Sequence, residues 1–172
     1  MTSERRVASE GYLFTDFYQL TMGQLYFRHG LGTRRAQFDY FFRSHPHYGD
    51  HAAGYSIFAG LDWFVDWMLA TRPAPADLEY LGGLTGRGGE RLFADDYLAF
   101  LAEHGTFEGL TVRAVPEGRV VHPNVPVVVV DGPLAAAQLV ETSLLNHLNY
   151  QTLVATKAAR MREVARGGVV LE

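Results

Sequence analysis

The chain has 172 residues, of which 48% are hydrophobic and 20% charged, as in an ordinary globular domain. Fifteen Lys and Arg residues against nineteen Asp and Glu give a net charge of −4, which argues against a general nucleic-acid or anionic-membrane binder, since both need a basic face. The absence of cysteine excludes disulfides, zinc–thiolate centres, iron–sulfur clusters and a cysteine nucleophile.

The first predicted elements are a helix, a strand and a loop. Residues Thr15 to Phe27 have apolar side chains at helical spacing, Asp16 is suited to cap the start, and Gly30 is suited to end the helix. Residues Gln37 to Arg43 alternate aromatic and polar side chains, which predicts a strand with one aromatic face. The polar residues from Ser44 to Gly54 predict a loop.

Three helices and a group of short strands are predicted next. The helices are Leu61–Leu69, Pro75–Leu81 and Ala94–Glu103, and the connection Gly82–Gly89 is rich in glycine. From Leu110 to Val130, prolines and a glycine separate short β-branched runs, which predicts a β-meander.

The last forty residues change character. Two helices are predicted, Leu134–Tyr150 and Gln151–Ala165, followed by an apolar strand at Val169–Leu171. The order of elements predicts a small α+β domain and then the opening of a parallel α/β unit. Because a buried strand with nothing after it is unusual for a complete domain, we expect the front part of a longer protein.

Membrane and secretion signals are not found in this sequence. The first fifteen residues contain no apolar core of a secretory signal, and the longest aliphatic run, Val127 to Val130, is far shorter than the ~20 residues of a membrane span. We therefore expect an intracellular, cytoplasmic protein with no membrane partner and no nucleic-acid partner.

Few residues predict chemistry by themselves. His45, His47 and His51 form an H-x-H-x3-H pattern, but loop histidines without a nearby acid or cysteine are more often solvated than bound to metal. No phosphate-binding loop of the G-x-x-x-x-G-K-[ST] type and no G-x-S-x-G elbow is present.

Two segments carry more polar side chains than packing requires. The first is TDFYQLTM, Thr15 to Met22, and the second runs from Glu141 to Arg160 among leucines, valines and alanines. Buried polar groups need hydrogen bonds, so each segment forms either a satisfied network or the wall of a polar cleft. The residues alone leave both alternatives open.

Five motifs in order resemble the nicotinate phosphoribosyltransferase family, over about residues 12 to 172. They are TDFYQLTM, QFDYFFR, GYSIFAGL, AVPEGRVVHPNVPVVVVDGPLAAAQLVET and LLNHLNYQTLVATKAAR. The resemblance implies an α+β amino-terminal domain with a β-meander at residues 1–132, holding parts of the substrate pocket and of the dimer interface. It further implies that residues 133–172 are the helix pair and first strand of an α/β barrel of the type II phosphoribosyltransferase kind.

The same resemblance implies an activity in NAD salvage. The family transfers phosphoribosyl from phosphoribosyl pyrophosphate to nicotinic acid with Mg²⁺, which gives nicotinate mononucleotide and pyrophosphate. ATP hydrolysis is coupled through a transient phosphohistidine, so the family is classed as a ligase. A homodimer with shared active sites is implied as well.

Four substrate-binding residues follow from the resemblance. Tyr18 corresponds to the aromatic residue that stacks on the pyridine ring, often in the neighbouring subunit's site, and Asp16 to an acid near the same pocket. Asn149 and Thr152 lie on the helix pair that abuts the barrel. The resemblance implies no catalytic residue and no metal ligand here, because it places the phosphohistidine and the phosphate-binding arginines after residue 172; we expect the chain alone to be inactive.

Other functions remain as alternatives. Quinolinate-specific relatives have Arg after the Glu that opens the corresponding helix, whereas Thr142 follows Glu141 here, which favours a monocarboxylate. Nicotinamide-specific relatives share the Asp-x-Tyr pattern, but QLTM and AVPEG fit the nicotinate enzymes better. A non-catalytic remnant that binds partner subunits is the alternative from a different class.

Overall fold

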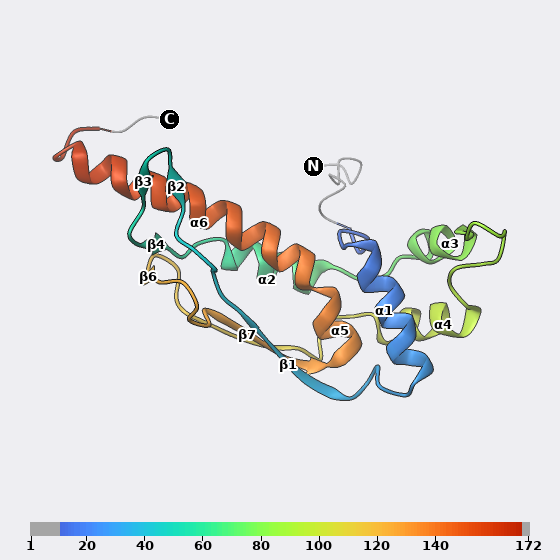
Figure 1. Ribbon diagram of the computed structural model, residues 1–172. Helices are drawn as coiled ribbons and strands as arrows, with labels where there is room; N and C mark the ends of the chain where they lie inside the picture. The colour runs from blue at the N-terminus through green and yellow to red at the C-terminus, as the bar shows by residue number, and fades with distance from the viewer. Residues whose placement is uncertain (1–10, 170–172) are drawn as a thin grey trace, which may run out of the picture. The chain divides into compact units, whose positions relative to one another are not determined.

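The computed structural model describes residues 11–169, in which helices and short strands alternate (Figure 1). The helices are α1 (Phe17–Arg28), α2 (Leu61–Ala70), α3 (Pro75–Gly83), α4 (Asp95–His104), α5 (Leu134–Leu139) and α6 (Glu141–Val164). The strands are β1 (Arg35–Tyr40), β2 (His47–Tyr48), β3 (His51–Ala52), β4 (Ser56–Ile57), β5 (Thr111–Ala114), β6 (Val120–Val121) and β7 (Val128–Pro133). None of these helices is long and apolar enough to cross a membrane.

Helix α1 begins and ends where its local signals predict. Asp16 is the N-cap residue, with extended backbone angles, and its N–H donates to Oε1 of Gln19 at 3.3 Å, as in a capping box. At the other end the Gly30 N–H donates to the Phe27 carbonyl, and Gly30 has a φ of +66°. The sequence-based bounds of this helix are confirmed to within two residues.

The expected meander from Leu110 to Val130 is wrong. The three-stranded sheet has the order β1-β7-β5, and β6 pairs instead with β4, with Ser56 opposite Val121. Prolines in the connections between β5, β6 and β7 have no N–H to donate, so these connections cannot extend a ladder. The expected loop 44–54 also contains a small antiparallel hairpin, in which Tyr48 lies opposite His51.

The predicted break between two C-terminal helices is misplaced. Helix α6 passes through residues 150 and 151 without interruption, and the break falls at Val140, between α5 and α6. Tyr150 has no neighbouring glycine or proline to end the helix. At the real break Thr15 Oγ1 lies 3.3 Å from the Leu139 carbonyl, within hydrogen-bond distance. The predicted strand 169–171 falls almost wholly outside the described residues, and Val169 is not in a strand.

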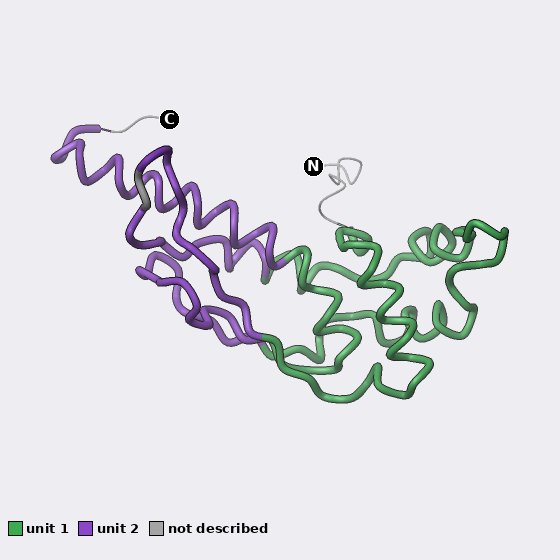
Figure 2. Tube along the Cα trace, viewed as in Figure 1, with its two compact units in different colours: residues 1–38, 65–111, 130–143 green, residues 39–64, 112–129, 144–172 purple. Residues whose placement is uncertain are grey.

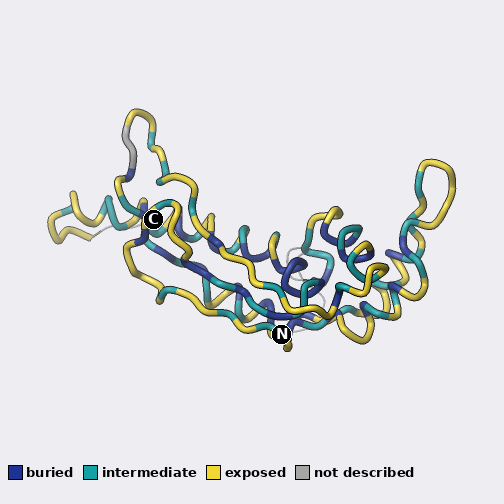
Figure 3. The backbone as a smooth tube through the Cα atoms, turned by 60° about the horizontal axis from the view of Figure 1, so that its bottom comes forward, coloured by how far each residue is buried: buried dark blue, intermediate teal, exposed yellow. Residues whose placement is uncertain are grey.

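Backbone contacts divide the chain into two compact units (Figure 2). Unit 1 comprises residues 1–38, 65–111 and 130–143, and unit 2 comprises residues 39–64, 112–129 and 144–172. Each unit has buried and exposed stretches of its own (Figure 3). The boundary at residues 132 and 133 expected from the sequence stays a prediction.

Aromatic side chains form the core of unit 1. Tyr97 on α4 is fully buried and its hydroxyl donates to the Leu20 carbonyl of α1 at 3.0 Å. The ring of Phe107 stacks on Tyr12 and on Trp67, with centroids 6.2 and 5.3 Å apart. Burial raises the pKa of Tyr12 and of Tyr97 well above the usual range, so both remain protonated at neutral pH.

Unit 2 is organised by the contact between α6 and the segment after β3. Thr156 Oγ1 accepts from the Ile57 N–H at 2.9 Å, and Thr152 Oγ1 accepts from the Ala59 N–H at 3.2 Å. Gly60 follows with a φ of +100°, close to the backbone of α6. The motif GYSIFAGL therefore needs a glycine at this position, because a Cβ atom there would clash with the His147 carbonyl.

We expect Gly60→Ala to lower the free energy of unfolding by about 1–3 kcal/mol, since alanine at this position suffers both backbone strain and the clash with His147. Urea denaturation followed by circular dichroism measures the change. The matched control is Gly83→Ala at the end of α3, where an added Cβ meets nothing within 4 Å. Equal stabilities of the two variants would contradict this account of the motif.

Candidate functional site

The starts of helices α1 and α6 meet in unit 1 and gather the polar residues of both motif segments. Asp16 and Tyr18 lie at the start of α1, and Glu141 and Thr142 open α6. Between them lies Gln19, which is fully buried. Three of these five residues come from the start of α1 and two from the start of α6, more than 120 positions away along the chain, and hydrogen bonds join the two groups.

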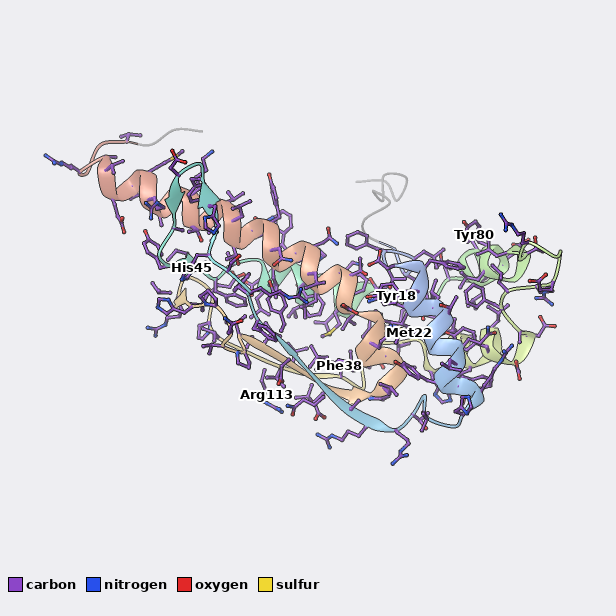
Figure 4. All side chains as sticks on the ribbon, viewed as in Figure 1. Tyr18, Met22, Phe38, His45, Tyr80 and Arg113 are labelled. Carbon is purple, nitrogen blue, oxygen red and sulfur yellow. The ribbon has the colours of Figure 1, made fainter. Side chains whose placement is uncertain are left out.

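Tyr18 is held by its hydroxyl. Its O–H donates to Oε2 of Glu141 at 2.9 Å, and Nε2 of Gln19 donates to the same oxygen at 3.0 Å. The side chain is 46% exposed, so much of it remains open to solvent (Figure 4). Partial burial, followed by the hydrogen bond to Glu141, raises the pKa of Tyr18 above its ordinary value. The phenol is therefore a neutral hydrogen-bond donor at physiological pH.

Asp16 is fixed by Thr142. The Asp16 N–H donates to Thr142 Oγ1 at 3.1 Å. The Thr142 hydroxyl has one proton, which it donates either to Asp16 Oδ2 at 2.9 Å or to Gln19 Oε1 at 3.1 Å. The Thr15 hydroxyl likewise donates its one proton either to Gln19 Oε1 or to the Leu139 carbonyl. Both carboxylates lie at helix N-termini, where the helix dipole favours negative charge.

The cluster offers an aromatic surface beside two carboxylates. A half-exposed tyrosine with an anchored hydroxyl can stack on a flat ring without losing much conformational freedom. Two carboxylates by themselves do not make a magnesium site, because Mg²⁺ needs an octahedral shell of oxygen ligands, which it usually completes with water and substrate phosphates. Among the described residues there is no group of three His, Cys, Asp or Glu that could hold a metal ion.

Asn149 and Thr152 lie in unit 2, on neighbouring turns of α6. Oδ1 of the exposed Asn149 accepts from the Tyr40 hydroxyl at 2.7 Å, and burial raises the pKa of Tyr40. The buried Thr152 hydroxyl contacts both the N–H and the carbonyl of Ala59, each at 3.2 Å. The structure thus joins Asp16 with Tyr18 inside one unit, and it places Asn149 and Thr152 together in the other.

Three residues of the unit 1 cluster were not among the sequence-based candidates. They are Gln19, Glu141 and Thr142. The high density of polar side chains in both segments was their signal, and it left a satisfied network or a cleft wall as alternatives. In unit 1 the satisfied network is the arrangement found. Whether the four predicted residues bind substrate stays a prediction.

Residues 13–149 match the family model described as the nicotinate phosphoribosyltransferase (NAPRTase) N-terminal domain. The chain belongs to the nicotinate phosphoribosyltransferase family. The fold is shared as well, because a crystal structure of human nicotinic acid phosphoribosyltransferase superposes with a TM-score of 0.74 and 38% identity. That match covers 92% of this chain and 30% of the human chain.

Curated relatives give the same family. Nicotinate phosphoribosyltransferase of Caenorhabditis elegans is 39% identical over 153 residues, which are 89% of this chain and 26% of the relative. A nicotinate phosphoribosyltransferase of Mycobacterium tuberculosis is 42% identical over 163 residues, 94% of this chain and 32% of the relative. The chain therefore spans less than a third of the length of these family members.

We expect Glu141→Gln to lower the pKa of Tyr18, because the substitution removes the negative charge that favours the protonated phenol. NMR titration of chain labelled with ¹³C at tyrosine Cζ measures this pKa. Tyr55 is the internal control, since its hydroxyl donates to a different carboxylate, Glu163, at 2.8 Å. An unchanged Tyr18 pKa beside an unchanged Tyr55 pKa would contradict the proposed anchoring by Glu141.

We expect Thr152→Val to destabilise the chain by about 1–3 kcal/mol, because the isosteric valine leaves the Ala59 N–H without its partner. Chemical denaturation measures the change. Thr21→Val is a suitable control, since the exposed Thr21 hydroxyl bonds only within its own helix, to the Tyr18 carbonyl. A Thr152→Val variant as stable as the unsubstituted chain would show that this hydroxyl does not hold the segment.

Proposed function

We propose that the chain forms part of a nicotinate phosphoribosyltransferase, which transfers phosphoribosyl from phosphoribosyl pyrophosphate to nicotinic acid and releases pyrophosphate in NAD salvage. The observation that carries this proposal is the half-exposed Tyr18, anchored by Glu141 in a chain whose residues 13–149 match the family. Because the chain spans less than a third of its relatives, the activity is proposed for the protein that contains these residues.

Tyr18 is the residue that we expect to touch the substrate ring. Nicotinate is flat and electron-poor, and the reaction requires its nitrogen to face the ribose carbon, so stacking on a fixed ring lowers the entropic part of the barrier. Asp16, fixed by Thr142, would orient the ribose or a phosphate-binding arginine. Asn149 is exposed and would contact substrate directly, whereas the buried Thr152 would act through the segment it holds.

A monocarboxylate substrate is supported by the residue after Glu141. Recognition of a second carboxylate, as in quinolinate, calls for a cation, and arginine provides the matching planar pair of donors. Thr142 is neutral, and it lies within hydrogen-bond distance of the Asp16 carboxylate, which would repel a further anion. We propose nicotinate and not nicotinamide as the substrate, because residues 13–149 match the family model of nicotinate phosphoribosyltransferases.

Several parts of the proposal depend on the family resemblance. They are ATP coupling through a phosphohistidine, the use of Mg²⁺, the homodimer with shared sites, the cytoplasmic location and the α/β barrel to which residues 133–172 would lead. Magnesium would be held with the pyrophosphate outside the described cluster, and no step here depends on it. The chain's own residues orient substrate.

We expect Tyr18→Ala to raise the KM for nicotinate about tenfold, the equivalent of 1.4 kcal/mol of lost stacking, with a smaller change in kcat. Tyr18→Phe keeps the ring and should stay near the original KM. The assay follows formation of nicotinate mononucleotide by the product of the complete reading frame, with nicotinate, nicotinamide and quinolinate compared as substrates. An unchanged KM in Tyr18→Ala would contradict the stacking role.

Tyr80→Ala is the matched control, because Tyr80 is 61% exposed on α3 and has no place in the proposed site. The 172-residue chain alone is expected to show no turnover. If it binds nicotinate tightly without turnover, and the product of the complete reading frame is also inactive, the chain is a binding module and the enzymatic proposal fails.

A further inference from the structure

Unit 2 contains a pair of histidines that the proposed function does not use. His45 lies between β1 and β2, and His122 directly follows β6. His45 is labelled in Figure 4, beside the end of the β4–β6 strand pair. Its imidazole is partly buried, whereas His122 is exposed.

The pairing of β4 with β6 brings these side chains together. Ser56 lies opposite Val121 in the register, so His122 directly follows the residue that faces Ser56. The buried Ser56 places its Oγ 3.0 Å from Nδ1 of His45. The His45 ring is thus held at one nitrogen, and its other nitrogen, Nε2, faces His122.

The spacing of the two imidazoles suits a shared metal ion. Nε2 of His45 and Nδ1 of His122 are 3.4 Å apart, and the rings are steeply inclined, at 79°. A direct N–H···N hydrogen bond of this length would be weak. Two nitrogen ligands at about 2.0–2.1 Å from a tetrahedral zinc ion are themselves separated by about 3.3 Å.

The hydrogen bond between His45 and Ser56 also suits metal binding by His45. When Nδ1 donates its proton to Ser56 Oγ, the lone pair of Nε2 is left for a cation. Histidine ligands in proteins generally donate their second N–H to a neighbouring group in this way.

We propose that His45 and His122 bind a divalent cation of the Zn²⁺ class, with water completing a tetrahedral shell. Imidazole nitrogen suits Zn²⁺, Ni²⁺ or Cu²⁺ far better than Mg²⁺, so this site is separate from the magnesium of the proposed reaction. With only two protein ligands, we expect the bound ion to exchange readily with solution. No third His, Cys, Asp or Glu joins this pair among residues 11–169.

The proposal is tested by titrating the chain with ZnCl₂ in a calorimeter and with CoCl₂ in a visible spectrometer. We expect one Zn²⁺ per chain and an intense Co²⁺ absorption typical of tetrahedral coordination. His45→Ala and His122→Ala should each weaken Zn²⁺ binding about tenfold or more and abolish the Co²⁺ band. Ser56→Ala should weaken binding about tenfold, as substitutions of groups that orient a ligand do.

Two controls keep the test decisive. His104→Ala removes an exposed histidine of α4 in unit 1 and should leave Zn²⁺ affinity unchanged. His47→Ala tests the H-x-H-x3-H loop pattern; if it abolishes binding while His122→Ala does not, the loop binds the metal and the proposal is overturned. Circular dichroism establishes that each variant is folded. Unchanged affinity in folded His45→Ala and His122→Ala would overturn the proposal as well.

Discussion

The buried side chain of Gln19 is the point on which the unit 1 cluster depends. Its amide N–H₂ donates to Glu141, and its carbonyl oxygen lies within hydrogen-bond distance of the Asp16 N–H and of the Thr15 and Thr142 hydroxyls. An unpaired amide in the interior would cost several kcal/mol, so the residues around it are constrained to supply partners. Because these partners come from the starts of two helices, satisfying one amide fixes how α1 and α6 begin relative to each other within unit 1. The orientation of Tyr18 follows from that constraint.

Unit 2 uses polar side chains of α6 in a comparable manner. Thr152 and Thr156 lie one turn apart, and their hydroxyls bond the Ala59 and Ile57 N–H groups. These backbone groups belong to a strand of only two residues and its extension, which a sheet ladder could not satisfy by itself. The hydroxyls of two helix threonines therefore supply the hydrogen-bond acceptors that a neighbouring strand would otherwise provide. This explains polar residues in an otherwise apolar stretch without any ligand being required.

The part of this fold that the sequence predicts is the part decided locally. The bounds of α1 follow from Asp16, Gln19 and Gly30, which act within a turn of the helix ends. The break at Val140 and the pairing of β6 with β4 were missed, because they depend on contacts such as Thr15 with the Leu139 carbonyl, more than 120 residues away along the chain. Periodicity carries no information about such pairs. A pattern along the sequence likewise cannot show that Tyr18 contacts Glu141.

The same reasoning explains what could be predicted of the site. Asp16 and Tyr18 came from a family motif, whereas Glu141 and Thr142 were singled out for substrate preference and polar density and not as the partners of Asp16 and Tyr18. The pair His45 and His122 had no sequence signal at all, since the obvious pattern was the one among His45, His47 and His51. Spatial neighbours that flank paired strands become visible only when the strand register is known.

The chemistry open to Tyr18 is narrowed by its partners. A phenol that donates to a carboxylate and has a raised pKa remains protonated at neutral pH, so it is unsuited to act as a general base. What remains is its aromatic surface, held in place by a hydrogen bond at one end. Under the proposed function, phosphoribosyl transfer through an oxocarbenium-like centre would need a positioned nucleophile more than an acid or a base, and a tyrosine that orients a flat ring would meet that need.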